Sequence, residues 1–140
     1  MPHIPDIAVF QSKLATLPLV TYRAGETVLR AASTTGQLLI LKEGKVAVVK
    51  EDVEIARVTE PGAVFGELSV LLDQPHTADV RALEASQFHV ADAATILRID
   101  PFALLYVATV LAQRLDNANR GLLELKRQKL LRFSVMTLPV

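Results

Sequence analysis

The 140-residue sequence contains no cysteine. Disulfide frameworks, thiolate nucleophiles and cysteine-ligated zinc sites all require that residue, so this chain can form none of them. The lack of cysteine fits a reducing compartment. The opening stretch, MPHIPDIAVF, also lacks the basic leader and the long apolar core of a secretory signal. We therefore expect a cytoplasmic protein.

The sequence also lacks an excess of charge of either sign. Fifteen Lys and Arg residues balance fifteen Asp and Glu residues, which gives a formal net charge of zero. No general electrostatic field therefore draws the chain to nucleic acid or to an anionic membrane. The longest apolar run, residues 102–112, is much shorter than the roughly 20 residues of a membrane-spanning helix. We expect no nucleic acid and no membrane among the partners, and any bound anion must be held by a local site.

Residues suited to metal binding or nucleophilic catalysis are also sparse. The histidines, at positions 3, 76 and 89, lie far apart in the sequence and lack the spacing of metal ligands. Ser69 has no motif that would place a general base beside it. We expect no metal, no cofactor and no enzymatic activity.

The chain does contain a series of short apolar runs rich in valine and isoleucine. Between residues 17 and 91 these runs recur at intervals of roughly 8 to 12 residues, separated by turn signals such as Glu43-Gly44 and Pro61-Gly62. Short strands at this spacing are typical of a β-sandwich or a β-barrel. We therefore predict a mainly β protein, an eight-stranded, jelly-roll-like β-roll.

Helices are predicted on both sides of the β-rich segment. Residues 6–16 carry apolar side chains at helical spacing. Asp92 can cap a short helix over residues 93–99, and a longer helix begins at Pro101. The expected organisation is one domain over residues 1–140, with an N-terminal helix at 1–16, the β-roll at 17–91 and two C-terminal helices at 92–132.

The long C-terminal helix carries a heptad pattern, which is typical of a coiled coil. Its first half can also pack against the protein's own β-roll. Past Asp116 the helix extends beyond what a small barrel covers, so there we expect a homodimer or another protein partner. Gly121 weakens the pattern, because glycine in a helix costs about 1 kcal/mol relative to alanine. The apolar residues alternate spacings of four and three: Leu104, Ala108, Leu111, Leu115, Ala118, Leu122 and Leu125.

The stretch FGELSVLLDQPHTA, residues 65–78, interrupts the β pattern with a glycine turn and a one-turn helix, ELSVLL. The start of a helix offers free backbone N–H groups and a partial positive charge, which suit an anion, and Gly66 allows a ligand to approach the backbone. Glu67 would repel a phosphate but can accept hydrogen bonds from hydroxyls of the same ligand. This combination suggests a sugar phosphate. The alternative is that Glu67 is a surface acid, favoured by the helix dipole alone.

This stretch is similar to the phosphate-binding cassette of the cyclic nucleotide-binding domain family, found in bacterial catabolite-activator-type regulators, cyclic nucleotide-dependent kinases and gated channels. The family's cassette resembles F-G-E-L-A-L-L, a short loop, and then P-R-[AST]-A. The resemblance covers nearly the whole chain, because the order of helix, eight strands, cassette helix and two helices also matches. Two further turns match: Gly25-Glu26 and Glu43-Gly44-Lys45-Val46.

The resemblance implies a non-catalytic sensor of cyclic AMP or cyclic GMP. Backbone N–H groups of Gly66 and Leu68 would bind the phosphate, and Glu67 would accept a hydrogen bond from the ribose 2′-hydroxyl. Thr77 and Ala78 would line the phosphate and the base, and in the kinases a threonine at the first of these positions accompanies a preference for cyclic GMP. The expected ligand-binding residues are Phe65, Gly66, Glu67, Leu68, Ser69, Pro75, His76, Thr77 and Ala78.

Position 76 departs from the family, because His76 stands where the family has the arginine that grips the cyclic phosphate. Arginine is always charged and donates to two phosphate oxygens at once, whereas imidazole donates one N–H to any one oxygen and is mostly neutral at neutral pH. Losing a charge-assisted hydrogen bond costs about 1.5–3 kcal/mol, or roughly ten- to a hundredfold in affinity. Three interpretations stay open: His76 is a phosphate ligand that acts when protonated, the pocket takes a different small ligand, or it no longer binds anything.

Two functions are consistent with these observations. The first is a ligand-sensing module in which binding changes the packing of the C-terminal helix. In the family that helix also caps the base, and Asn117, Asn119 and Arg120 have suitable donors. The second is a domain that has lost the ability to bind a ligand and serves as a dimerisation or scaffold module. The chain stops about where catabolite-activator-type regulators begin their DNA-reading unit, so we expect output through dimerisation or a partner protein.

Overall fold

The computed structural model describes residues 12–137, without the side chains of residues 97, 99 and 133–137. The chain divides into two compact units, one that ends at Val107 and one that begins at Ala108. Residues 12–14 are helical and a turn follows them. The part of the predicted N-terminal helix that precedes residue 12 lies outside the described residues.

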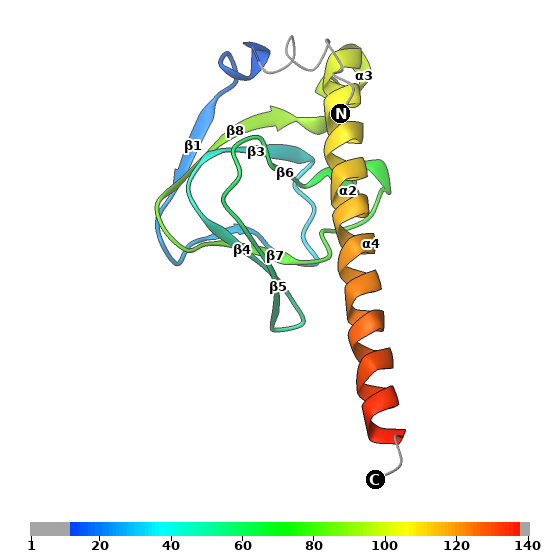
Figure 1. Cartoon of the computed structure of the whole chain (residues 1–140). Helices are drawn as coiled ribbons and strands as arrows, with labels where there is room; N and C mark the ends of the chain where they lie inside the picture. Colours follow the sequence, from blue (N-terminus) through cyan, green and yellow to red (C-terminus); the bar gives the residue numbers. More distant parts are fainter. Residues whose placement is uncertain (1–11, 138–140) are drawn as a thin grey trace. The chain divides into compact units, whose positions relative to one another are not determined.

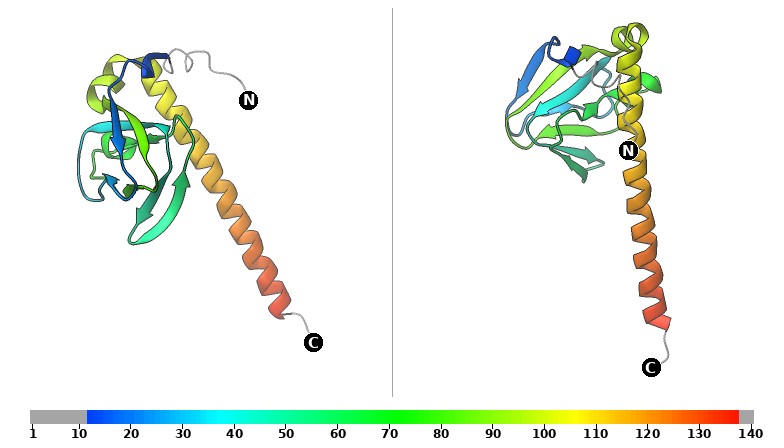
Figure 2. Two further views of the ribbon diagram at one scale, coloured as in Figure 1. Left: turned by 90° about the vertical axis from the view of Figure 1, so that its left-hand side faces the viewer. Right: turned by 45° about the horizontal axis from the view of Figure 1, so that its top comes forward.

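The first unit is built on eight strands in two four-stranded antiparallel sheets (Figure 1). One sheet has the strand order β1-β8-β3-β6 and the other the order β2-β7-β4-β5. Figure 2 shows from two further sides how the strands curl into a roll. The predicted eight-stranded β-roll is therefore confirmed. The strands are β1 (Leu19–Tyr22), β2 (Thr27–Leu29), β3 (Gln37–Glu43), β4 (Val46–Lys50), β5 (Val53–Val58), β6 (Val64–Phe65), β7 (Asp79–Ala82) and β8 (Ser86–Asp92).

Aromatic rings form the centre of the core. Phe88 on β8 is fully buried, and the rings of Tyr22 and Phe65 meet it edge to face at centroid distances of 5.8 and 6.0 Å. This is a preferred geometry for aromatic pairs. Aliphatic side chains from both sheets complete the buried cluster: Val28, Leu29, Leu39, Leu41, Val46, Val80 and Ala82.

Helix starts follow the capping signals in the sequence. The Asp92 side chain accepts a hydrogen bond from the Thr95 N–H at 3.5 Å, as predicted. Asp100 accepts one from the Phe102 N–H at 3.0 Å and pairs with Lys13 Nζ at 3.1 Å. Both carboxylates satisfy backbone donors that a helix start leaves free. The helices are α2 (Glu67–Leu71), α3 (Ala93–Ile99) and α4 (Pro101–Thr137).

Strand β3 is buried on both of its faces. Leu39 and Leu41 belong to the core cluster, yet Leu38 and Ile40 on the opposite face are only 2% and 1% exposed. Both α2 and α3 contact this strand. A strand covered on both sides needs apolar residues at successive positions, which explains the unbroken LLIL run.

The second unit contains the part of α4 that begins at Ala108, and the helix continues past its predicted end at residue 132. Three leucines of the heptad pattern are more than half exposed on it: Leu115 (62%), Leu122 (53%) and Leu125 (65%). Among residues 12–137, no helix combines the length and the hydropathy needed to cross a membrane.

Candidate functional site

The cassette begins at Gly66, directly after β6. This residue has φ 93° and ψ −2°, the left-handed conformation, and is the N-cap of α2. A β-carbon on it would lie 2.5 Å from the carbonyl oxygen of Gln37 on β3. Glycine alone tolerates both the positive φ and the close backbone. The predicted order of strand end, glycine turn and one-turn helix is confirmed.

Glu67 and Ser69 are the buried residues of α2, with exposed fractions of 4% and 5%. Leu68 between them is 43% exposed. A carboxylate is rarely buried to this extent without a partner. Glu67 is therefore not the surface acid that one interpretation of the sequence allowed.

His76 lies beside the glycine turn and is only 7% exposed. Its Nε2 is 3.2 Å from the Thr35 hydroxyl oxygen, and its Cε1 would be 3.7 Å from a β-carbon on Gly66. Its backbone N–H donates to the Ser33 carbonyl at 2.9 Å, and its carbonyl accepts from the Ala32 N–H at 2.8 Å. The imidazole is thus held at the cassette from both the side chain and the backbone.

The loop between β2 and β3, residues 30–36, is the part of the site that sequence reasoning missed. It supplies Thr35, which contacts the His76 ring. It is tied to the start of β7, because Asp79 accepts a hydrogen bond from the Ala31 N–H at 2.7 Å. In the sequence this loop is marked only by the turn signal STTG, residues 33–36. A turn signal does not indicate which distant segment the loop will contact in the folded chain.

The other predicted site residues differ in their surroundings. Phe65 contacts Phe88 and so belongs to the core. Pro75 and Thr77 are exposed, and Ala78 is partly exposed. The loop before them is closed onto α2 by a backbone hydrogen bond from the Gln74 N–H to the Ser69 carbonyl at 3.0 Å. The cassette therefore has a buried part, which contains Glu67, Ser69 and His76, and an exposed part, which contains Pro75 and Thr77.

Asn117, Asn119 and Arg120, the suggested donors to a base, belong to the second unit. Arg120 pairs with Asp116 at 2.9 Å, one helical turn away. Contact of these residues with a base stays a prediction. In the part of the chain that the structure describes, no cluster of three or more His, Asp or Glu side chains could hold a metal ion.

Comparison with known proteins gives one family. Residues 19–99, from the start of β1 to the end of α3, match the family model of the cyclic nucleotide-binding domain. A cGMP-dependent protein kinase of Plasmodium berghei (strain Anka) is 40% identical over 65 residues, which are 46% of this chain and 8% of the kinase. The chain thus corresponds to a small part of that relative.

Solved structures of low sequence identity have the same fold. The catabolite activator protein of Thermus thermophilus has a TM-score of 0.68 at 22% identity, over 88% of this chain and 60% of that one. A cyclic nucleotide-binding domain from Methylobacillus flagellatus KT has a TM-score of 0.71 at 19% identity, over 89% of this chain and 75% of that one. The family match includes the complete β-roll and its cassette, and this chain therefore belongs to the cyclic nucleotide-binding domain family.

Proposed function

We propose that the cassette from Gly66 to Ala78 binds a cyclic nucleotide, and that the domain senses this ligand without catalysing a reaction. The Gly66 turn supports this most directly. The left-handed backbone of Gly66 lies close to the Gln37 carbonyl oxygen. Gly66 is also the N-cap residue of α2, and it provides no side-chain hydrogen bond to the start of that helix. The backbone N–H groups there suit a phosphate, and buried Glu67 and His76 both follow the turn in the sequence.

Each residue then has a separate role toward the ligand. The N–H groups of Gly66 and Leu68 donate to the cyclic phosphate, while Glu67 accepts from the ribose 2′-hydroxyl. His76 donates one ring N–H to a phosphate oxygen, which gives a weaker clamp than an arginine would. Exposed Thr77 can offer its hydroxyl to a guanine, and the Plasmodium relative is a cGMP-dependent kinase. We therefore place cyclic GMP ahead of cyclic AMP.

Titration calorimetry with cyclic GMP and cyclic AMP tests this proposal. We expect both to bind, with cyclic GMP the tighter ligand. Glu67→Gln should weaken binding by roughly ten- to a hundredfold, because it replaces a charge-assisted hydrogen bond with a neutral one. Glu84→Gln is the matched control, since it removes an exposed carboxylate outside the cassette.

The calorimetry has clear negative outcomes. Absence of heat with both nucleotides, from folded protein, would contradict the proposed binding and leave the scaffold function. Equal affinities of Glu67→Gln and Glu84→Gln would contradict the role given to the buried carboxylate. Circular dichroism of each variant separates loss of binding from loss of fold.

The exposed leucines of α4 support a second proposal, that two copies of this helix pair. Leu115, Leu122 and Leu125 occupy a and d positions of the heptad pattern. The pattern ends after them, because the next such positions are Lys129 and Arg132. A paired α4 would also give ligand binding an output, provided that the ligand prefers one arrangement of the helix over another.

The double substitution Leu115→Glu and Leu122→Glu should convert a dimer into a monomer, because it places like charges in the apolar seam. Analytical ultracentrifugation measures this directly. Leu123→Glu is the matched control, since Leu123 is 50% exposed but lies outside the seam. A monomeric wild-type protein, or equal dissociation of control and double variant, would contradict pairing through this seam.

A further inference from the structure

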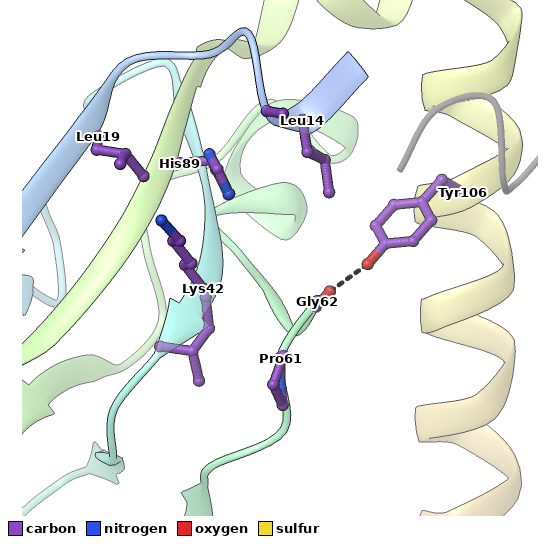
Figure 3. Close-up of a pocket in the computed structure, with 9 residues that line it drawn as sticks. Leu14, Leu19, Lys42, Pro61, Gly62, His89 and Tyr106 are labelled. Atoms are coloured by element: carbon purple, nitrogen blue, oxygen red, sulfur yellow. Dashed lines mark hydrogen bonds between the residues drawn. The ribbon is translucent and has the colours of Figure 1, made fainter. Parts of the chain in front are cut away.

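A second concave site lies apart from the cassette, against the sheet that contains β1, β8 and β3 (Figure 3). Its volume is about 390 Å³, within the roughly 300–1,000 Å³ of small-molecule sites. All of its lining residues belong to the first unit, and none belongs to the segment 65–78. They are Leu14, Ala15, Leu19, Leu41, Lys42, Pro61, Gly62, His89 and Tyr106.

The sheet register explains why a histidine faces this cavity. His89 on β8 pairs with Leu19 on β1 and with Ile40 on β3, so the three side chains share one face. Because side chains alternate along a strand, this face is opposite to that of the core residue Phe88. Figure 3 shows the Lys42 side chain reaching toward the His89 ring beside Leu19.

The cavity holds an unusual polar group. His89 is only 9% exposed, and its Nδ1 is buried without a hydrogen-bond partner among the described residues. Such an atom costs free energy until a partner is supplied. Burial and the Lys42 charge lower the pKa of His89, and the Leu17 backbone opposes this only in part. The imidazole is therefore neutral at neutral pH, with one donor and one acceptor.

The remaining lining groups define what the cavity can accept. The Tyr106 hydroxyl already donates to the Gly62 carbonyl at 2.5 Å. Among the residues that the structure describes, Lys42 is the one charged residue that lines the cavity, and no carboxylate lines it. The other walls are mostly aliphatic. An anionic head group therefore meets an attractive charge here, whereas an amine meets a repulsive one.

We propose that this cavity binds a small carboxylate with an apolar body. The carboxylate pairs with the Lys42 ammonium group, and the neutral His89 ring lies beside this pair. The apolar body lies against Leu14, Leu19 and the ring of Tyr106. This site uses no cassette residue, so its existence does not depend on nucleotide binding.

The test uses the full chain, octanoate as the probe, and 1-octanol and octylamine as probes of matched length. We expect octanoate to shift the NMR signals of the His89 and Tyr106 side chains. In calorimetry it should bind at least about tenfold more tightly than octanol, because only the carboxylate gains the charge-assisted contact. Octylamine should bind no better than octanol.

Two variants make the assignment specific. Lys42→Met keeps the length of the side chain and should lower octanoate affinity by about tenfold or more. Lys50→Met, an exposed lysine at the end of β4, should leave it unchanged. Glu67→Gln in the cassette should also leave it unchanged, which separates this site from the nucleotide site. Unshifted His89 signals at millimolar octanoate, equal binding of octanol, or an unaffected Lys42→Met variant would each overturn the proposal.

Discussion

Replacing His76 with arginine should raise the affinity for cyclic nucleotides by roughly ten- to a hundredfold. The guanidinium group can donate to two phosphate oxygens at once and carries its charge at every physiological pH. The structure places residue 76 beside the Gly66 turn and holds its backbone with hydrogen bonds to Ala32 and Ser33. These backbone hydrogen bonds hold residue 76 in place, so the arginine side chain starts from the same position beside the cassette as the histidine does.

Calorimetry of three variants separates charge from geometry. His76→Lys supplies a positive charge without the planar fork, and His76→Gln supplies a neutral donor of similar size. We expect the order of affinity Arg, Lys, Gln. A folded His76→Arg protein with no gain in affinity would contradict a surviving phosphate site. That result would favour the scaffold function.

Much of the fold could be predicted from the sequence because its signals are local. Apolar runs bounded by turn residues locate each strand, Asp92 marks the start of α3 through a hydrogen bond to a nearby N–H group, and Pro101 marks the start of α4. The end of α4 was less predictable. Leu130 and Leu131 are exposed on it, so no burial pattern marks where the helix stops.

The candidate site was predictable only where it is contiguous. Gly66 and Glu67 adjoin in the sequence and follow a strand, so their turn could be predicted, and the structure shows why glycine is required. Thr35 could not be assigned to the site, because it reaches His76 from a loop about forty residues away in the sequence. The cavity around His89 was equally hidden. It forms only when β1, β3, β8 and the start of α4 come together.

Replacing Gly66 with alanine should both destabilise the protein and abolish measurable nucleotide binding. An alanine in the left-handed conformation costs about 1–2 kcal/mol. In addition, the new β-carbon would lie 2.5 Å from the Gln37 carbonyl oxygen, a contact that only a backbone shift can relieve. That shift moves the N–H groups at the start of α2, on which the proposed phosphate contacts depend.

Gly25→Ala is the matched control for this substitution. Gly25 has a similar φ of 88°, but a β-carbon there meets no atom within 4 Å. The Gly25→Ala variant therefore has the conformational cost without the steric contact. The difference between the two variants in the free energy of unfolding by urea isolates the effect of the contact with Gln37. We expect Gly25→Ala to keep nucleotide affinity and Gly66→Ala to lose it and to unfold at lower urea concentration. Equal stability and equal affinity of the two variants would show that the approach of β3 to the cassette does not constrain residue 66.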